Sequence, residues 1–132
     1  MAFVKPEKNY ETMIRVRLSS GDAHYAGELV NGSHAIELMG DAATELMIMH
    51  DGNEGQCIGY DTIQFTAPMY AGDFLEVAAR IIGIEGNKRK VQCRAFKIAT
   101  NARIKEQDSA VDVLETPVMT SEAIATYVVP EK

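Results

Sequence analysis

Residues 33–50 read SHAIELMGDAATELMIMH, a run in which apolar residues recur at helical spacing. The pattern predicts an α-helix, and Asn31 or Ser33 can serve as its N-cap. Because so much of the helix circumference is apolar, we expect a sheet to wrap around this helix.

Strands are predicted on both sides of the helix. Before it, residues 13–18 alternate apolar and polar side chains, as a half-buried strand does. After it come a turn at 51–55 and strand signals at 56–65, 74–84, 88–99 and 122–129. The polar turn 85–87 joins two of these strands in a predicted hairpin.

One long apolar helix among strands that pair non-locally is an α+β pattern. It predicts a single domain, residues 1–132, in which a curved sheet surrounds the helix. Residues 100–121 are polar with one proline, and a short helix around 108–114 is one interpretation of this segment. The sheet would leave an open edge, which a second copy is expected to cover, giving a homodimer or a larger homo-oligomer.

Composition narrows the function classes. The net charge of −6 argues against a nucleic-acid partner, since neutralising phosphates needs a basic face. No apolar run reaches membrane-spanning length and the start of the chain lacks a signal-peptide pattern, so a cytoplasmic location with no membrane partner is expected. Cys57 and Cys93 lie in predicted strands without a CxxC pattern, which favours buried free thiols. The histidines form no HxxxH or HExxH pattern, so no metal site is predicted.

The connection before the helix, SSGDAHYAGELVNG at residues 19–32, gathers polar residues and glycines. Amides around Asn31 and Gly32 lie where a helix start offers unpaired donors and a partial positive charge, which would polarise a carbonyl oxygen. The alternative interpretation is a structural loop that only packs over the sheet edge. We interpret the segment as a pocket lining whose candidate side chains are those of Ser19, Asp22, His24 and Tyr25.

Asp41 and Glu45 stand one helical turn apart, on a face shared with Glu37. A solvated acidic stripe is the ordinary explanation on a surface helix. Here the helix is mostly apolar, and a carboxylate against an apolar wall is a competent general base. We therefore assign a catalytic role to Asp41 and Glu45 without choosing between them.

The basic run Lys88-Arg89-Lys90 has two interpretations, a solvated hairpin turn or a clamp for the phosphates of a nucleotide-bearing ligand. Tyr60 belongs either to the core or to a pocket wall. No P-loop, GxSxG or Rossmann glycine pattern is present, so phosphoryl transfer, serine-hydrolase and NAD chemistry are unsupported.

Several segments together resemble the hotdog-fold proteins and, within them, the β-aminoacyl-CoA ammonia lyases. The segments are SSGDAHYAGELVNG, GDAATEL at 40–46 and YDTIQFTAPMYAGDFLEV at 60–77. SAVDVLETPV at 109–118 and the ending TYVVP also match, and they favour the type acting on 3-aminobutyryl-CoA over the type acting on β-alanyl-CoA.

The resemblance implies an antiparallel sheet around one helix, sites at a dimer interface, and reversible elimination of ammonia from 3-aminobutyryl-CoA to give crotonyl-CoA in lysine fermentation. CoA is then part of the substrate, and no cofactor is implied. On this hypothesis Asp41 and Glu45 handle the α-proton, while Tyr25 or His24 faces the amino group.

One departure concerns the hotdog thioesterases, many of which carry a catalytic Asp in the motif MDEAA. This chain has MGDAA, so Gly40 takes the place of that Asp and Asp41 is rotated by about 100° around the helix. An acyl-CoA thioesterase is the second hypothesis, and a non-catalytic acyl-CoA-binding module is the third.

Overall fold

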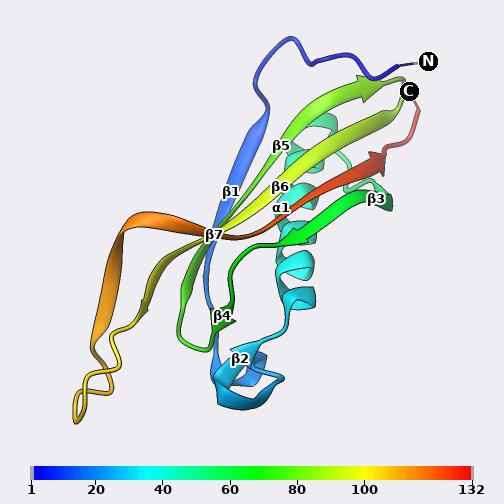
Figure 1. Cartoon of the computed structure of the whole chain (residues 1–132). Helices are drawn as coiled ribbons and strands as arrows, with labels where there is room; N and C mark the ends of the chain where they lie inside the picture. Colours follow the sequence, from blue (N-terminus) through cyan, green and yellow to red (C-terminus); the bar gives the residue numbers. More distant parts are fainter. Residues whose placement is uncertain (1, 132) are drawn as a thin grey trace.

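A five-stranded antiparallel sheet curves around one long helix in the computed structural model, which describes residues 2–131 (Figure 1). Along the chain the elements are β1 (Glu11–Arg17), the 3-10 helices η1 (Ser20–Asp22) and η2 (Ala26–Glu28), β2 (Leu29–Val30), α1 (Gly32–Asp51), β3 (Gln56–Phe65), β4 (Met69–Tyr70), β5 (Phe74–Glu85), β6 (Lys88–Asn101) and β7 (Val111–Val128). The sheet order is β1-β5-β6-β7-β3, and β2 and β4 form a separate small pair. The α+β class and the wrapped central helix are confirmed.

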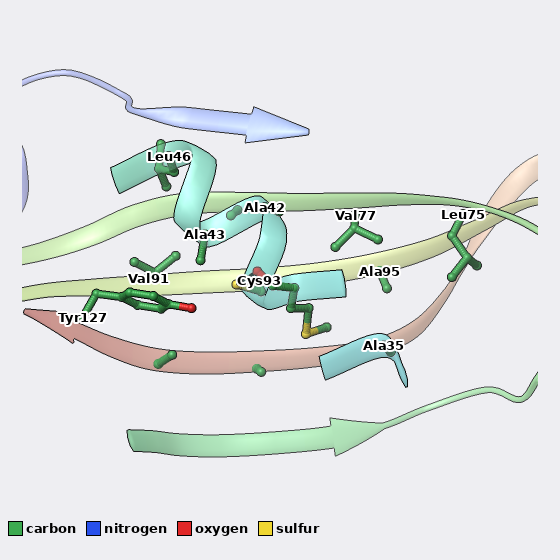
Figure 2. Packing of buried hydrophobic residues seen from close by; sticks show 14 of the residues in the cluster. Ala35, Ala42, Ala43, Leu46, Leu75, Val77, Val91, Cys93, Ala95 and Tyr127 are labelled. Atoms are coloured by element: carbon green, nitrogen blue, oxygen red, sulfur yellow. Dashed lines mark hydrogen bonds between the residues drawn. The ribbon is translucent and has the colours of Figure 1, made fainter. Parts of the chain in front are cut away.

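The core lies between one face of α1 and the face of the sheet that α1 covers (Figure 2). The buried helix residues are Ala35, Met39, Ala42, Ala43, Leu46 and Met47. Half of them are alanines, whose small side chains let the helix backbone approach the sheet closely. Alternate residues of β5 from Leu75 to Ile81 and of β6 from Val91 to Ala95 belong to the same core cluster, and Val77 and Val91 are fully buried. The helical period and the strand period therefore bring two apolar faces together.

The outer face of α1 exposes the carboxylates of Glu37, Asp41 and Glu45, and near its C-terminal end it also exposes the apolar side chains of Ile48 and Met49. Within residues 2–131, no helix combines the length and the apolar character that crossing a membrane requires.

A buried ion pair fastens the C-terminal end of α1 to the β5–β6 hairpin. The Arg89 guanidinium binds both carboxylate oxygens of Asp51, at 2.9 and 3.1 Å, and donates to the Gly86 carbonyl at 2.7 Å. His50 Nδ1 also lies 2.7 Å from Asp51. Burial disfavours the Asp51 carboxylate, but the hydrogen bonds from Arg89 and His50 outweigh it, so the pKa of Asp51 is lowered.

The interpretation of residues 108–114 as a short helix is wrong. From Val111 the chain is already in β7, which pairs with the end of β6 (Thr100 with Asp112, Ala99 with Val113) and forms a ribbon projecting from the body (Figure 1). The β-branched valines at 111 and 113 suit a strand better than a helix. The predicted start of the last strand at residue 122 was therefore too late.

Substitution of Asp51 should reveal the cost of leaving the buried Arg89 guanidinium without a carboxylate partner. We expect Asp51→Asn to lower the free energy of unfolding at about pH 7 by roughly 3 kcal/mol, measured by urea denaturation. Because the pKa of Asp51 is lower in the folded than in the unfolded protein, its carboxylate stabilises the fold fully at pH values above the unfolded pKa. This stabilisation is lost as the pH falls through the folded pKa. The gap between wild type and variant should thus narrow below about pH 4.

The control is Asp61→Asn, which breaks the ion pair between Lys90 and the half-exposed Asp61 on the outer surface. It should cost no more than about 1 kcal/mol. Equal losses for the two variants would contradict the assignment of the Asp51 pair as the structural fastening.

Candidate active site

The N-terminal end of α1 is the first part of the site. Asn31 is the N-cap residue, with extended φ and ψ of −65° and 143°, and the helix begins at Gly32. Of the two predicted N-cap candidates, Asn31 and Ser33, this geometry confirms Asn31. Its side chain does not cap the helix, since the Asn31 amide donates to the Ser33 hydroxyl. The His34 N–H donates to the Asn31 carbonyl at 3.0 Å, so the N–H groups of Gly32 and Ser33 are the first-turn donors left for another acceptor.

A cleft of about 400 Å³ opens beside this helix start. Its walls come from β2, β4, the end of β3 and the middle of β7, and they include Val30, Met69 and Phe65. Gly32 allows the close approach: a Cβ built on it would lie 2.5 Å from the Phe65 ring. Of the two binding residues predicted at the helix start, Gly32 lines this cleft and Asn31 does not.

The connection before the helix is held by hydrogen bonds between its own residues. The Ser19 amide donates to the Asp22 carboxylate at 2.7 Å, and this hydrogen bond lowers the pKa of Asp22, against a smaller opposing effect of burial. The amides of His24 and Tyr25 both donate to the Leu29 carbonyl. Their rings meet edge to face at 4.9 Å, and Tyr25 is 57% exposed. None of these four predicted side chains lines the cleft at Gly32.

His34 is a residue that the sequence interpretation missed. It stands in the first turn of α1 between two carboxylates, with Nε2 3.6 Å from Asp22 and Nδ1 3.9 Å from Glu37. No metal or nucleophile motif includes it, so the sequence offered no signal beyond its place near the helix start. The arrangement places an imidazole beside two carboxylates near the helix start.

Asp41 and Glu45 lie far along the helix from its start. At 1.5 Å per residue, they are about 13 and 20 Å from Gly32 along the axis. Both are exposed in the single chain, and Glu45 accepts a hydrogen bond from the Thr12 hydroxyl on β1. Because the α-carbon of a thioester is bonded to its carbonyl carbon, one chain cannot hold the oxygen at the helix start and present these carboxylates to the α-proton.

The basic run does not present three free cations. Arg89 is committed to Asp51, and Lys90 binds Asp61 at 2.6 Å, while Lys88 is exposed. The run also sits at the opposite end of α1 from the cleft, about 30 Å away for a helix of 20 residues. The phosphate clamp formed by all three residues is thus not preassembled in the single chain.

Tyr60 and the two cysteines form one group near the core. Both thiols are free, as predicted, but of the two predicted burials only that of Cys93 is confirmed, since Cys57 is half-buried. Burial, reinforced by Cys57, raises the pKa of the Cys93 thiol and of the Tyr60 hydroxyl to about 12 in each case. Tyr60 does not line the cleft at the helix start. Over residues 2–131 no cluster of three or more metal-ligating side chains occurs.

Comparison with curated proteins supplies the family. The chain is 44% identical over 121 residues to the 3-aminobutyryl-CoA ammonia lyase of Acetoanaerobium sticklandii, a match covering 92% of this chain and 95% of that protein. The protein belongs to the hotdog-fold CoA ammonia lyases. No protein-family model matches the chain.

Solved structures agree with this membership. The β-alanyl-CoA:ammonia lyase from Clostridium propionicum superposes with a TM-score of 0.87 at 34% identity, covering 92% of this chain and 85% of that chain. A hexameric thioesterase from Yersinia pestis superposes with a TM-score of 0.71 at 16% identity, covering 90% and 86% of the two chains. Likeness at that identity concerns the fold alone, so the ammonia lyase family has hotdog thioesterases as distant structural neighbours.

The thiols of this ammonia lyase should differ sharply in reactivity. A buried thiol with a raised pKa forms little thiolate near neutral pH. Titration of the native protein with a disulfide reagent at about pH 8 should modify Cys57 alone, and Cys93 should react only after denaturation. Cys93→Ser, in which a single thiol remains, identifies the fast site. Rapid modification of Cys93 in the folded protein would contradict its burial beneath α1.

Proposed function

We propose that this protein catalyses the reversible elimination of ammonia from 3-aminobutyryl-CoA, giving crotonyl-CoA. The observation that carries the proposal is the 44% identity to a 3-aminobutyryl-CoA ammonia lyase along 95% of that protein. The cleft at the α1 start supports it, because elimination next to a thioester needs donors that polarise the carbonyl oxygen. We place the reaction in lysine fermentation in the cytoplasm, with CoA as part of the substrate and no separate cofactor.

The reaction needs one base and one polarised carbonyl. A carboxylate takes the proton from C2, the C3–N bond breaks, and the substrate ammonium leaves as neutral ammonia. Electron density from the C2–H bond forms the double bond of the enoyl thioester. Hydrogen bonds from the first turn of α1 stabilise the negative charge that builds up on the thioester oxygen on the way.

We propose that two copies of the chain build each site. The separation of about 13 Å between Gly32 and Asp41 prevents one chain from doing both tasks. In an assembly, the helix start of one copy would face Asp41 and Glu45 of a second copy, with His24 or Tyr25 near the amino group. His34, beside Asp22, is a further candidate for holding a proton at the same end of the helix.

The exposed apolar surface supports such an assembly. β3 is an edge strand, and Ile58, Ile63 and Phe65 on it are 56%, 41% and 59% exposed. On α1, Ile48 and Met49 are 47% and 66% exposed. An apolar edge of this kind is normally covered, and we propose that the same edge of a second copy covers it, with further association into a larger homo-oligomer.

Residue 40 separates the lyase from the thioesterase alternative. A Cβ built on Gly40 would have no atom within 4 Å, so the helix has room for a side chain at this position. Packing therefore does not explain why residue 40 lacks the carboxylate that many hotdog thioesterases carry at this position. This favours the ammonia lyase over a hydrolase that uses an acid at residue 40.

The direct assay adds ammonium to crotonyl-CoA and follows both the enoyl absorbance and free thiol. We expect loss of enoyl absorbance without thiol release, and a fall in kcat of at least about 100-fold in Asp41→Asn/Glu45→Gln. Thiol release without amine addition would instead identify a thioesterase. Binding of crotonyl-CoA with no turnover in either channel would identify a non-catalytic binding module.

Mixing two inactive variants tests whether the site is shared between copies. Gly32→Pro removes the first helical N–H at a position that tolerates proline, and Asp41→Asn/Glu45→Gln removes the carboxylates. If each site combines groups from two chains, dimers reassembled from an equal mixture should regain about a quarter of wild-type activity. If both sets act within one chain, the mixture should stay inactive.

Gly32→Ala is the matched control for the first variant. It also places a Cβ against Phe65, but it keeps the backbone N–H. Its activity should therefore exceed that of Gly32→Pro by about 10-fold or more. Equal losses in both would attribute the defect to the displaced Phe65 ring.

A further inference from the structure

The floor of the cleft beside the α1 start holds a buried hydroxyl without a partner. Ser121 on β7 is 1% exposed and lines the cleft together with Gly32. Among the buried side-chain polar atoms of residues 2–131, its Oγ is the one that makes no hydrogen bond. A buried hydroxyl left unbonded is costly and uncommon in folded proteins, so it calls for a ligand or a function.

The other hydroxyls of the cleft are already used. Thr66 Oγ donates to the Met119 carbonyl at 2.6 Å, and Thr120 Oγ donates to the Ala95 carbonyl at 3.2 Å. These two bonds satisfy backbone acceptors where β7 departs from regular pairing. Ser121 differs because its side chain lies on the same face of β7 as Ala123 and Ala125, toward α1.

The surroundings define what Ser121 can bind. The residues that line the cleft are uncharged, and most are apolar. The start of α1 contributes a partial positive charge and N–H donors. This combination disfavours an ammonium group, which would find no carboxylate there, and it favours an oxygen that accepts hydrogen bonds.

We propose that the Ser121 hydroxyl donates a hydrogen bond to the thioester carbonyl oxygen of the acyl-CoA, beside the amide donors of the α1 start. This assignment rests on the proposed function for the identity of the substrate. It places the carbonyl in the uncharged cleft and requires the amino group to lie outside it, toward the acidic side chains. Ser121 then stabilises the charge that grows on the oxygen during proton removal.

The assignment separates the effects of Ser121→Ala on stability and on activity. Removal of an unbonded buried hydroxyl should leave the urea midpoint of the free protein unchanged or raise it. The same substitution should lower kcat for ammonia addition to crotonyl-CoA by about 100-fold, as loss of an oxyanion donor does. The control Thr126→Ala changes the opposite face of β7 and should preserve kcat.

Binding of butyryl-CoA, which has neither the amino group nor the double bond, gives a second readout. Calorimetry should show about threefold to tenfold weaker binding of butyryl-CoA to Ser121→Ala, with the affinity for CoA itself unchanged. The assignment would be overturned if the wild-type protein is an active lyase and Ser121→Ala changes neither kcat nor the affinity for butyryl-CoA. A variant with a lowered urea midpoint and full activity would also overturn it. If ammonia addition is absent but butyryl-CoA binding depends on Ser121, the proposed reaction fails and the assignment stands.

Discussion

The burial of one face of α1 against the sheet is the interaction on which the rest of the structure depends. Alanines along that face, such as Ala42 and Ala43, bring the helix close to the strands, and residues such as Val77 and Val91 fill the remaining space. Interiors of this density resist displacement of a packed helix. Both ends of α1 are therefore held at defined places on the sheet, and the two ends have different roles.

At its C-terminal end, α1 is fastened. Asp51, the last residue of the helix, forms a buried ion pair with Arg89. Gly52 ends the helix in the left-handed conformation, and its N–H donates to the Ile48 carbonyl. At its N-terminal end, the cap side chain turns away and Gly32 admits Phe65 from β3, which leaves donors facing a cleft. A helix with one satisfied end and one unsatisfied end can direct its dipole at a ligand while remaining fixed in position.

The length of α1 also explains why the single chain looks incomplete. The carboxylates of its outer face and the donors of its first turn are separated by more than two helical turns, and the apolar edge at β3 is uncovered. The proposed site shared between two copies accounts for both features, because it brings the two sets of groups together across an interface. In the proposed complex, the uncharged cleft with Ser121 at its floor holds the thioester carbonyl and leaves the amino group outside.

Much of this fold was determined by the sequence alone. The apolar period of residues 33–50 and the alternation in the strands specified the elements, because a helix period and a strand period bury different sets of positions. The strand at Gln56–Phe65 was predicted with its observed limits. Residues 108–114 were misjudged because the first residues of β7, 111–113, pair only with the end of β6.

The candidate site was decided mainly by tertiary structure. Sequence reasoning found the helix start at Asn31 and Gly32, since the cap pattern is local. It could not reveal that Arg89 is consumed by Asp51, or that Ser121, distant in sequence from Gly32, shares its cleft. Such relations depend on which strands lie side by side, and only the packing of the sheet around α1 settles that.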